Sequence, residues 1–260
     1  MNPQATNNKP GLLRRLATSL KHRDWASVGI ELFVVAIGIF LGLQVANWND
    51  DRLERVLERD YLVRLHEDIS ASASGLSRDN GFHKQQLSDQ KKILAALDAC
   101  EYPPDDAVAI QRGINTLGWL NPPRLFRRTI DDLAATGRMN IIRSTEIKTE
   151  LARLVQDVEF RDRVTSSVFR ILEHHRLTID ERVRYDVSKR VTEREWPVAV
   201  EFDIKAMCDD PVIASAISST SLVTLERLIA FEALLERYED FLPLIEQELK
   251  LRWDETIASE

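Results

Sequence analysis

The stretch LVRLHEDISASASGLSRDNGFHKQQLSDQKKILAAL, residues 62–97, decides the fold of this 260-residue chain. It contains no proline, and two rows of residues recur in it at intervals of seven, the spacing of one face of a long helix. The rows are Leu62, Ile69, Leu76, His83, Gln90 and Leu97, and Leu65, Ser72, Asp79, Gln86 and Ile93. Both rows are apolar at their ends and polar between. The pattern predicts one continuous helix over Asn47–Leu97 with a soft polar centre, not a strong coiled coil.

An apolar run precedes this helix. From Val28 to Ala46 only Glu31 and Gln44 are polar. At about 1.5 Å per residue this run spans roughly 28 Å, close to the roughly 30 Å of a hydrocarbon core. Trp25 and Trp48 flank it, as interfacial aromatic residues do. We predict a basic head over residues 1–24, a transmembrane signal anchor over 25–48 and a helical domain over 49–260.

A cleaved signal peptide is the alternative to an anchor. Its apolar region would be shorter, and cleavage after Ala46 would put Gln44 at the −3 position, where a small residue is expected. The anchor therefore fits the run better.

Charge sets the expected orientation. The formal charge is +3 over residues 1–46 and −10 over the remainder. A short basic head favours a cytoplasmic N-terminus, although arginines also follow the span. We expect a single-pass protein of the bacterial inner membrane with an extracytoplasmic, periplasmic domain. An acidic domain argues against nucleic acid as a partner.

Glu31, Gly38 and Gly42 are spaced by seven and four residues and share one face of the predicted span. The pair Gly38 and Gly42 forms a GxxxG pattern, which lets helix backbones approach closely in lipid. We interpret this face as packing against another transmembrane helix, a second copy or a partner's, with Glu31 hydrogen-bonded across the contact. The alternative is that Glu31 reaches the interface and the glycines are ordinary span residues.

The anchor resembles the N-terminal signature of an uncharacterised family of bacterial single-span membrane proteins, a domain of unknown function. That signature is a basic head followed by G-E-x-x-x-V-x-x-G-I and Q-x-x-N-W-N. The residues that carry the resemblance are Gly29, Glu31, Val34/Val35, Gly38-Ile39, Gln44 and Asn47-Trp48-Asn49. A weaker continuation covers Thr129–Ile142. The resemblance implies no activity, cofactor or partner.

Beyond the first helix, proline pairs, caps and apolar periodicity divide the chain into further helices. The expected elements are a short helix over 105–118, a helix over Arg124–Thr136 ended by Gly137, a helix over Thr145–Val187 begun by Ser144, an extended or irregular stretch over Val198–Phe202, and a last helix begun by Asp210-Pro211. The fold class is all-α, an N-terminal transmembrane helix followed by an elongated antiparallel helical bundle.

Charged residues on the helix over Arg124–Thr136 form a predicted partner surface. Arg127 and Asp131, and likewise Arg128 and Asp132, are four apart and can pair along the helix. With Arg124 they make the charged side of the segment 124–142, which we expect to contact a partner.

The chain has two cysteines, Cys100 and Cys208, too far apart in sequence for a CxxC motif. In an extracytoplasmic domain a disulfide between them is expected, and it would tie the end of the first long helix to the start of the last. The alternative is two buried free thiols.

The sequence contains no pattern of a known reaction. It has no GxSxG, P-loop or GxGxxG motif, His66-Glu67-Asp68 lacks the second histidine of a zincin, and His174 and His175 are adjacent and diverge on a helix. We therefore assign no catalytic residue, metal or cofactor.

The predicted function is that of a membrane-anchored scaffold, tether or accessory subunit that binds another membrane or envelope protein. The alternative is an extracytoplasmic sensor of a small ligand, held in the polar region Ser72–Gln90, that signals through a partner. An enzyme is the third reading, and it would need clustered ionisable groups that are brought together only by folding.

The anchor interpretation predicts that Gly38→Ile/Gly42→Ile weakens helix–helix association in membranes, because the larger side chains hold the backbones apart. A reporter assay of transmembrane association measures this. Association that is unchanged in the double variant would remove the packing hypothesis.

Overall fold

The computed structural model describes residues 25–190 and 198–254, and these fall into two compact units that divide between Val56 and Leu57. The elements in chain order are α2 (Trp25–Ala99), η1 (Pro104–Asp106), α3 (Ala107–Thr116), α4 (Arg128–Ala135), η2 (Arg138–Ile141), α5 (Thr145–Asp180), β1 (Val183–Arg190), β2 (Val198–Phe202), α6 (Ile204–Cys208) and α7 (Pro211–Trp253). The predicted fold class, an N-terminal apolar helix followed by a helical bundle, is confirmed.

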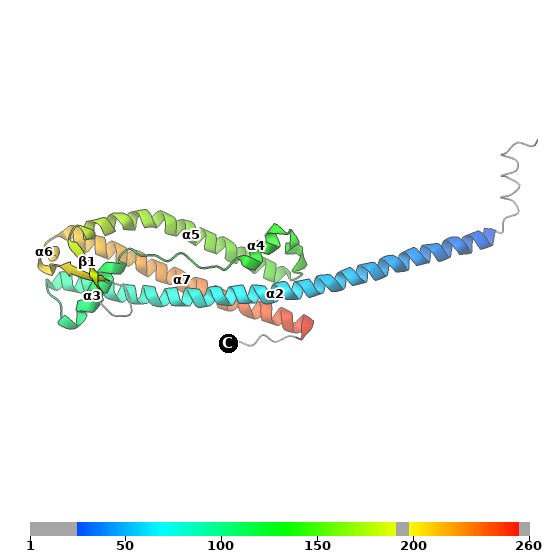
Figure 1. Ribbon diagram of the computed structural model, residues 1–260, viewed down its shortest axis with the longest axis horizontal. Helices are drawn as coiled ribbons and strands as arrows, with labels where there is room; N and C mark the ends of the chain where they lie inside the picture. The colour runs from blue at the N-terminus through cyan, green and yellow to red at the C-terminus, as the bar shows by residue number, and fades with distance from the viewer. Residues whose placement is uncertain (1–24, 191–197, 255–260) are drawn as a thin grey trace, which may run out of the picture. The chain divides into compact units, whose positions relative to one another are not determined.

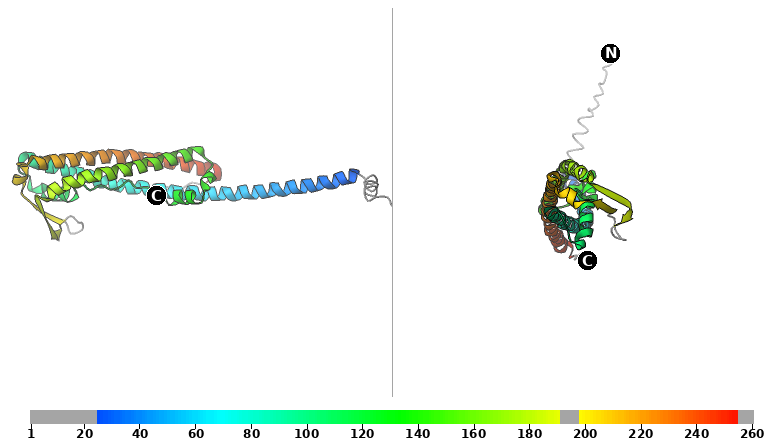
Figure 2. Two further views of the ribbon diagram at one scale, coloured as in Figure 1. Left: turned by 90° about the horizontal axis from the view of Figure 1, so that it is seen from above. Right: turned by 90° about the vertical axis from the view of Figure 1, so that its left-hand side faces the viewer.

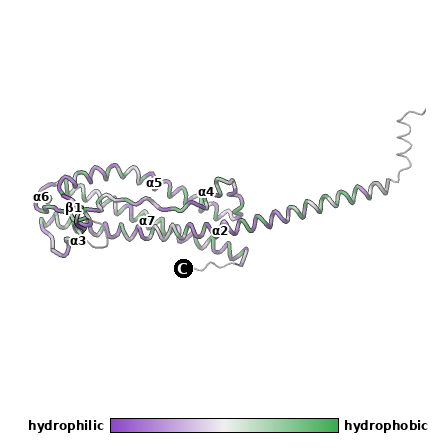
Figure 3. The backbone as a smooth tube through the Cα atoms, viewed as in Figure 1, coloured by the Kyte–Doolittle hydropathy of each residue, from purple (hydrophilic) through white to green (hydrophobic). Residues whose placement is uncertain are grey.

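The first unit is the N-terminal part of α2. Every side chain from Gly29 to Val56 is exposed, among them large apolar ones such as Leu32 and Phe33. Figure 3 shows the hydrophobic residues concentrated along this stretch. Within the described part of the chain two helices are long and apolar enough to cross a membrane, the one from Gly29 to Ala99 and α7. They differ in burial: the apolar window of the first is wholly exposed, whereas 39% of the window in α7 is buried inside the protein.

In the second unit the C-terminal half of α2 lies beside α5 and α7 (Figure 1). Helix α7 runs antiparallel to α2, because Glu58 contacts Arg252 at one end and Gln90 contacts Thr224 towards the other. It also runs antiparallel to α5, with which it makes the most extensive helix–helix contact. The helices α2 and α5 are therefore parallel, and the chain must return along the bundle between them.

The return path is an extended segment, residues 117–127, between α3 and α4. Figure 1 shows it running along the bundle from the α3 end to the α4 end. The predicted helix over Arg124–Thr136 is therefore too long, and α4 starts at Arg128. The backbone before Arg128 is drawn out because the Phe126 amide donates to Ser72 Oγ and the Arg124 carbonyl accepts from the Tyr238 hydroxyl.

The core consists of two apolar clusters, one towards each end of the bundle. One gathers α2 residues such as Leu62 and Ile69 with Phe231 and Ile245 of α7, and the other gathers Ile93 with residues of α3, β2, α6 and the start of α7. Between the clusters many of the buried side chains are polar, although Leu87, Leu172 and Leu228 are buried outside both clusters. The apolar ends of the two heptad rows therefore lie in the two apolar clusters, and their polar centre lies between the clusters.

Helix α5 ends at Asp180, so the prediction of helix to Val187 is wrong. Residues Val183–Arg190 form β1 instead, which pairs antiparallel with β2. Pairing satisfies the backbone of both strands, and Val183 and Tyr185 pack against the second apolar cluster. Figure 2 shows the hairpin standing out from the helices. The stretch over Val198–Phe202, predicted to be extended or irregular, forms β2.

Local signals mark the helix ends as predicted. The Ser144 hydroxyl accepts from the Ile147 amide at the start of α5, and the Asp210 carboxylate accepts from the Val212 amide at the start of α7. Gly137 follows α4 with φ +66°, a left-handed conformation that glycine adopts without strain.

A disulfide joins Cys100, just after α2, to Cys208, the last residue of α6, with Cα atoms 5.6 Å apart. It links the end of the first long helix to the start of the last. On the chain-entropy account, closing a loop of about 100 residues stabilises a fold by up to about 4–5 kcal/mol.

Candidate functional site

The polar residues at the centre of α2 hold the extended return segment in place. Gln86 Nε2 donates to the carbonyl oxygens of Thr116 (2.5 Å) and Trp119 (3.1 Å). Asp79 accepts from Asn121 (2.8 Å) and from Arg124 (2.6 Å), and Ser72 Oγ accepts from the Phe126 amide (2.9 Å). Three side chains spaced by seven residues thus follow the segment from one end to the other. We call Ser72, Asp79 and Gln86 the polar seam.

Two buried carboxylates extend the pattern towards the start of the second unit. Asp68 accepts from the Thr129 amide at 2.8 Å, and Glu58, which is fully buried, accepts from the Arg143 amide at 2.6 Å. Arg252 also contacts Glu58 at 3.2 Å, and this ion pair fastens the end of α7 to α2. Backbone amides and arginines together compensate the buried charge.

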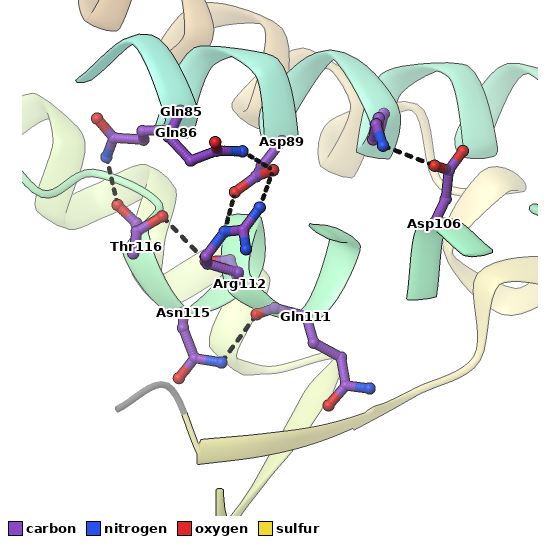
Figure 4. A network of polar contacts seen from close by, with 9 residues as sticks. Gln85, Gln86, Asp89, Asp106, Gln111, Arg112, Asn115 and Thr116 are labelled. Atoms are coloured by element: carbon purple, nitrogen blue, oxygen red, sulfur yellow. Dashed lines mark hydrogen bonds and ion pairs between the residues drawn. The ribbon is translucent and has the colours of Figure 1, made fainter. Parts of the chain in front are cut away.

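Helix α3 is fastened to α2 by a fork of two charge-assisted hydrogen bonds (Figure 4). Arg112 donates from Nε (2.6 Å) and Nη2 (2.8 Å) to the two oxygens of Asp89. At Gly113 a Cβ atom would lie 2.8 Å from Ile93 and 3.1 Å from Asp89, so glycine is required for this close approach. The carboxylate of Asp89 is buried and stays paired because of the fork.

The polar residues of the heptad row that begins with Leu62 contact α7. Gln90 donates to Thr224 Oγ1 at 3.2 Å, and the His83 ring meets Phe231 edge to face at 5.7 Å. His83 is fully buried, its Nδ1 pairs with Gln86, and its Nε2 has no hydrogen-bond partner among the described residues. Burial lowers the pKa of His83 below its ordinary value, with the nearby Arg227 adding to the effect. The imidazole is therefore neutral at pH 7.

The sensor hypothesis places a ligand within the region Ser72–Gln90. In the structure the polar side chains of this region bind the segment over 117–127 and α7 instead. Heptad spacing identified the polar positions but not the segments of the chain that pack against them.

A cavity of about 190 Å³ lies beside the seam, between α5 and α7, with Leu120 of the return segment in its wall. The lining is mostly apolar and includes Phe160, Val164, Val168, Val223 and Ala230. Arg161, Thr165, Glu226 and Arg227 supply its polar groups.

Arg227 is the unusual member of this lining. It is only 8% exposed, donates to Thr165 Oγ1 and stacks 4.9 Å from the centre of the Phe231 ring. Among residues 25–190 and 198–254 no carboxylate lies within ion-pair distance of it. Burial, helped by the positive charge of Arg161 and opposed by the negative charge of Asp162, lowers the pKa of Arg227 to about 10. The side chain is therefore still charged at pH 7.

Sequence reasoning missed Arg227. The signal was available on α7, where polar residues interrupt the apolar row between Ile217 and Phe231. These residues are Thr220, Ser221, Thr224 and Arg227, and all of them are buried. The first three are small and bond to their own helix, which leaves Arg227 as the buried charge.

The predicted anchor residues are exposed on the first unit. Glu31, Gly38 and Gly42 lie on α2, and apart from the adjoining turns of the same helix no described atom lies within 4 Å of the Cβ position of either glycine. This face is open within the chain, and the hypothesis that another helix packs on it stays a prediction.

The predicted charged partner surface is largely engaged in contacts within the domain. Arg127 pairs with Asp131 (3.3 Å) as expected. The expected Arg128–Asp132 pair is wrong, because Arg128 contacts Asp68 (3.3 Å) and Asp132 accepts from the Tyr61 hydroxyl (3.0 Å). Tertiary contacts with α2 replace the pair along the helix.

These contacts leave Arg128 and Asp131 exposed, with 76% and 63% of their side chains accessible. Arg124, by contrast, is bound to Asp79 of the seam. The segment's role in binding a partner stays a prediction.

Within the described ranges no three His, Cys, Asp or Glu residues gather as a metal-ligand set. His66 pairs with Glu246 at 2.9 Å, and the rings of His174 and His175 are 6.0 Å apart.

Comparison of the chain with protein-family models, curated proteins and solved structures found no match. The candidate site is accordingly argued from its own geometry.

Asp79→Ala is predicted to lower the free energy of unfolding by about 2–3 kcal/mol, because Arg124 and Asn121 lose their acceptor and the return segment loses its central attachment. Urea denaturation of the detergent-solubilised chain measures the change. The matched control is Asp105→Ala, an exposed carboxylate, with an expected change within about 0.5 kcal/mol. An equally small change for Asp79→Ala would contradict the structural role of the seam.

The buried His83 predicts a pH dependence. Its pKa is lower in the folded than in the unfolded protein, so the unfolded state binds more protons and stability is lost as pH falls below the ordinary histidine value of about 6.5. Between pH 7 and 5 the wild-type free energy of unfolding should fall more steeply than that of His83→Leu. The difference in slope is at most about 1.4 kcal/mol per pH unit. Identical slopes would show that His83 is not held neutral.

Proposed function

We propose that the chain is a membrane-anchored helical protein whose domain over residues 57–260 binds another protein of the cell envelope, as a scaffold, tether or accessory subunit. The observation that carries this proposal is a set of exposed apolar side chains on α5 and α7. Large apolar groups gathered on the surface of a folded domain are typical of interaction sites.

Three of the exposed apolar residues on each helix follow helical spacing. They are Phe160, Val164 and Ile171 on α5, and Leu222, Leu225 and Ile229 on α7, each more than 40% exposed. Four further exposed apolar residues lie outside these two sets: Phe169 and Leu177 on α5, and Val212 and Leu251 on α7. Intervals of four and seven on α5, and of three and four on α7, keep each set on one face. We call them the α5 stripe and the α7 stripe. Phe160 and Val164 also line the cavity between α5 and α7, so the α5 stripe borders that cavity.

The proposed localisation is the bacterial inner membrane, with residues 25–48 as a single span, a cytoplasmic N-terminus and an extracytoplasmic domain. The wholly exposed apolar window at the start of α2 supports the span. For α7 the burial of residues such as Phe231 and Tyr238 in the core favours a helix of the domain over a second span. The Cys100–Cys208 disulfide favours an oxidising compartment.

The proposed partners are the membrane, through the span, and an envelope protein, through the stripes. Self-association through the face of Glu31, Gly38 and Gly42 is a further part of the proposal. Nucleic acid is not among the proposed partners, since the domain is acidic. We propose no catalytic activity and no cofactor.

The second candidate function is an extracytoplasmic sensor of a small ligand. A specific observation favours it, the cavity between α5 and α7 with the buried, unpaired charge of Arg227 in its wall.

If the stripes bind an envelope protein, a crosslinking group placed on a stripe should form a covalent adduct with that protein. A photoreactive amino acid placed at Ile171 or Leu225 of the full chain should crosslink in living cells to one envelope protein, identified by mass spectrometry. The matched control is Glu173, which is exposed and lies on a different face of α5. Crosslinks to lipid alone, or the same products from Glu173, would contradict a protein-binding face.

A further inference from the structure

The cavity between α5 and α7 combines an apolar wall with one buried arginine, Arg227. Its apolar lining comes from both helices and from Leu120, and its volume of about 190 Å³ is below the several hundred Å³ of sites for drug-sized ligands. The ligand that fits is therefore small and largely apolar.

Two arginines line this cavity, Arg161 and Arg227. Arg161 is compensated, because it pairs with Asp157 at 3.1 Å. Arg227 is more than nine-tenths buried and binds only the Thr165 hydroxyl and the face of Phe231. A guanidinium has five N–H donors, so most of the hydrogen-bonding capacity of Arg227 is unused by the described residues.

A buried charge is costly unless it is paired. The other buried charges of the domain obey this rule: Asp79 is paired with Arg124, Asp89 with Arg112, and Glu58 with Arg252. Arg227 departs from it, and it does so in the wall of a cavity. An anion entering the cavity would supply the missing partner.

Two features limit the class of anion that the cavity can bind. A carboxylate can accept two parallel hydrogen bonds from a guanidinium, which suits the free donors of Arg227. Glu226 lines the cavity from an exposed position and repels a second negative charge. A monoanion is therefore favoured over a dianion such as phosphate.

We propose that this cavity binds a short aliphatic monocarboxylate, with its carboxylate on Arg227 and its hydrocarbon chain against the valines and Phe160. The inference rests on the second candidate function, ligand binding, and it gives that function a site and a ligand class. It does not require a protein partner.

The test is titration calorimetry of the full chain in lipid nanodiscs with sodium octanoate, corrected with empty nanodiscs. Wild type should bind octanoate saturably at one site per chain. Octanol, which lacks the charge, should bind at least about tenfold more weakly, because a hydrogen bond between charged groups is worth a factor of this order. Acetate, which lacks the hydrocarbon chain, should also bind at least about tenfold more weakly, because it buries far less apolar surface.

Arg227→Met should keep the fold, since an apolar side chain of similar length replaces an unpaired buried charge, and should lose at least about tenfold in octanoate affinity. The matched control is Arg170→Met, an exposed arginine of α5, which should bind as wild type does. Ala230→Leu leaves Arg227 in place but fills the cavity, and it should also weaken binding.

Absence of saturable octanoate binding to wild type would overturn the proposal. So would octanol binding as tightly as octanoate, or unchanged affinity in both Arg227→Met and Ala230→Leu. Because calorimetry uses the purified chain, these outcomes are independent of whether the stripes capture an envelope protein.

Discussion

The fold of the domain depends on polar side chains of α2 that hold the segment over residues 117–127 by hydrogen bonds. They do for this segment what a neighbouring strand or helix would otherwise do. This extended segment is only partly buried, and the backbone groups on its side facing α2 have no neighbouring strand with which to hydrogen-bond. Gln86 and Ser72 bond to that backbone directly, while Asp79 holds the segment through the side chains of Asn121 and Arg124. This attachment lets α5 run parallel to α2, and it brings Leu120 into the wall of the cavity.

Sequence reasoning could predict the elements whose signals are local. The helix start at Ser144, the left-handed Gly137 and the Asp210-Pro211 start each depend on neighbouring residues only. The strand β1 could not be predicted in this way, because its partner lies beyond residue 190 in the chain. The seam positions were visible as heptad polar residues, but their partners were not. Gln86 and Ser72 bind backbone atoms, and Asp79 binds side chains that are more than forty residues away in the sequence. The unpaired state of Arg227 likewise depends on tertiary packing.

The division of the core into two apolar clusters has an energetic consequence. Apolar burial at each end supplies most of the favourable free energy, whereas the polar band between them contributes little net energy but permits few alternative pairings. In this band His83 and Gln90 each have a buried polar atom to which no described residue hydrogen-bonds. The band is therefore the part of the core with the least complete hydrogen bonding. Packing there is specified by hydrogen bonds, and so the middle of the bundle responds most to a change in charge.

The cavity and the proposed partner surface share atoms, which couples the two candidate functions. Phe160 and Val164 belong to the α5 stripe and also line the cavity that contains Arg227. A carboxylate on Arg227 would place its hydrocarbon chain against these side chains and change the surface that a partner meets. By thermodynamic linkage, any effect of the ligand on partner affinity must be matched by an equal effect of the partner on ligand affinity. A tether and a sensor are therefore compatible roles for one pair of helices.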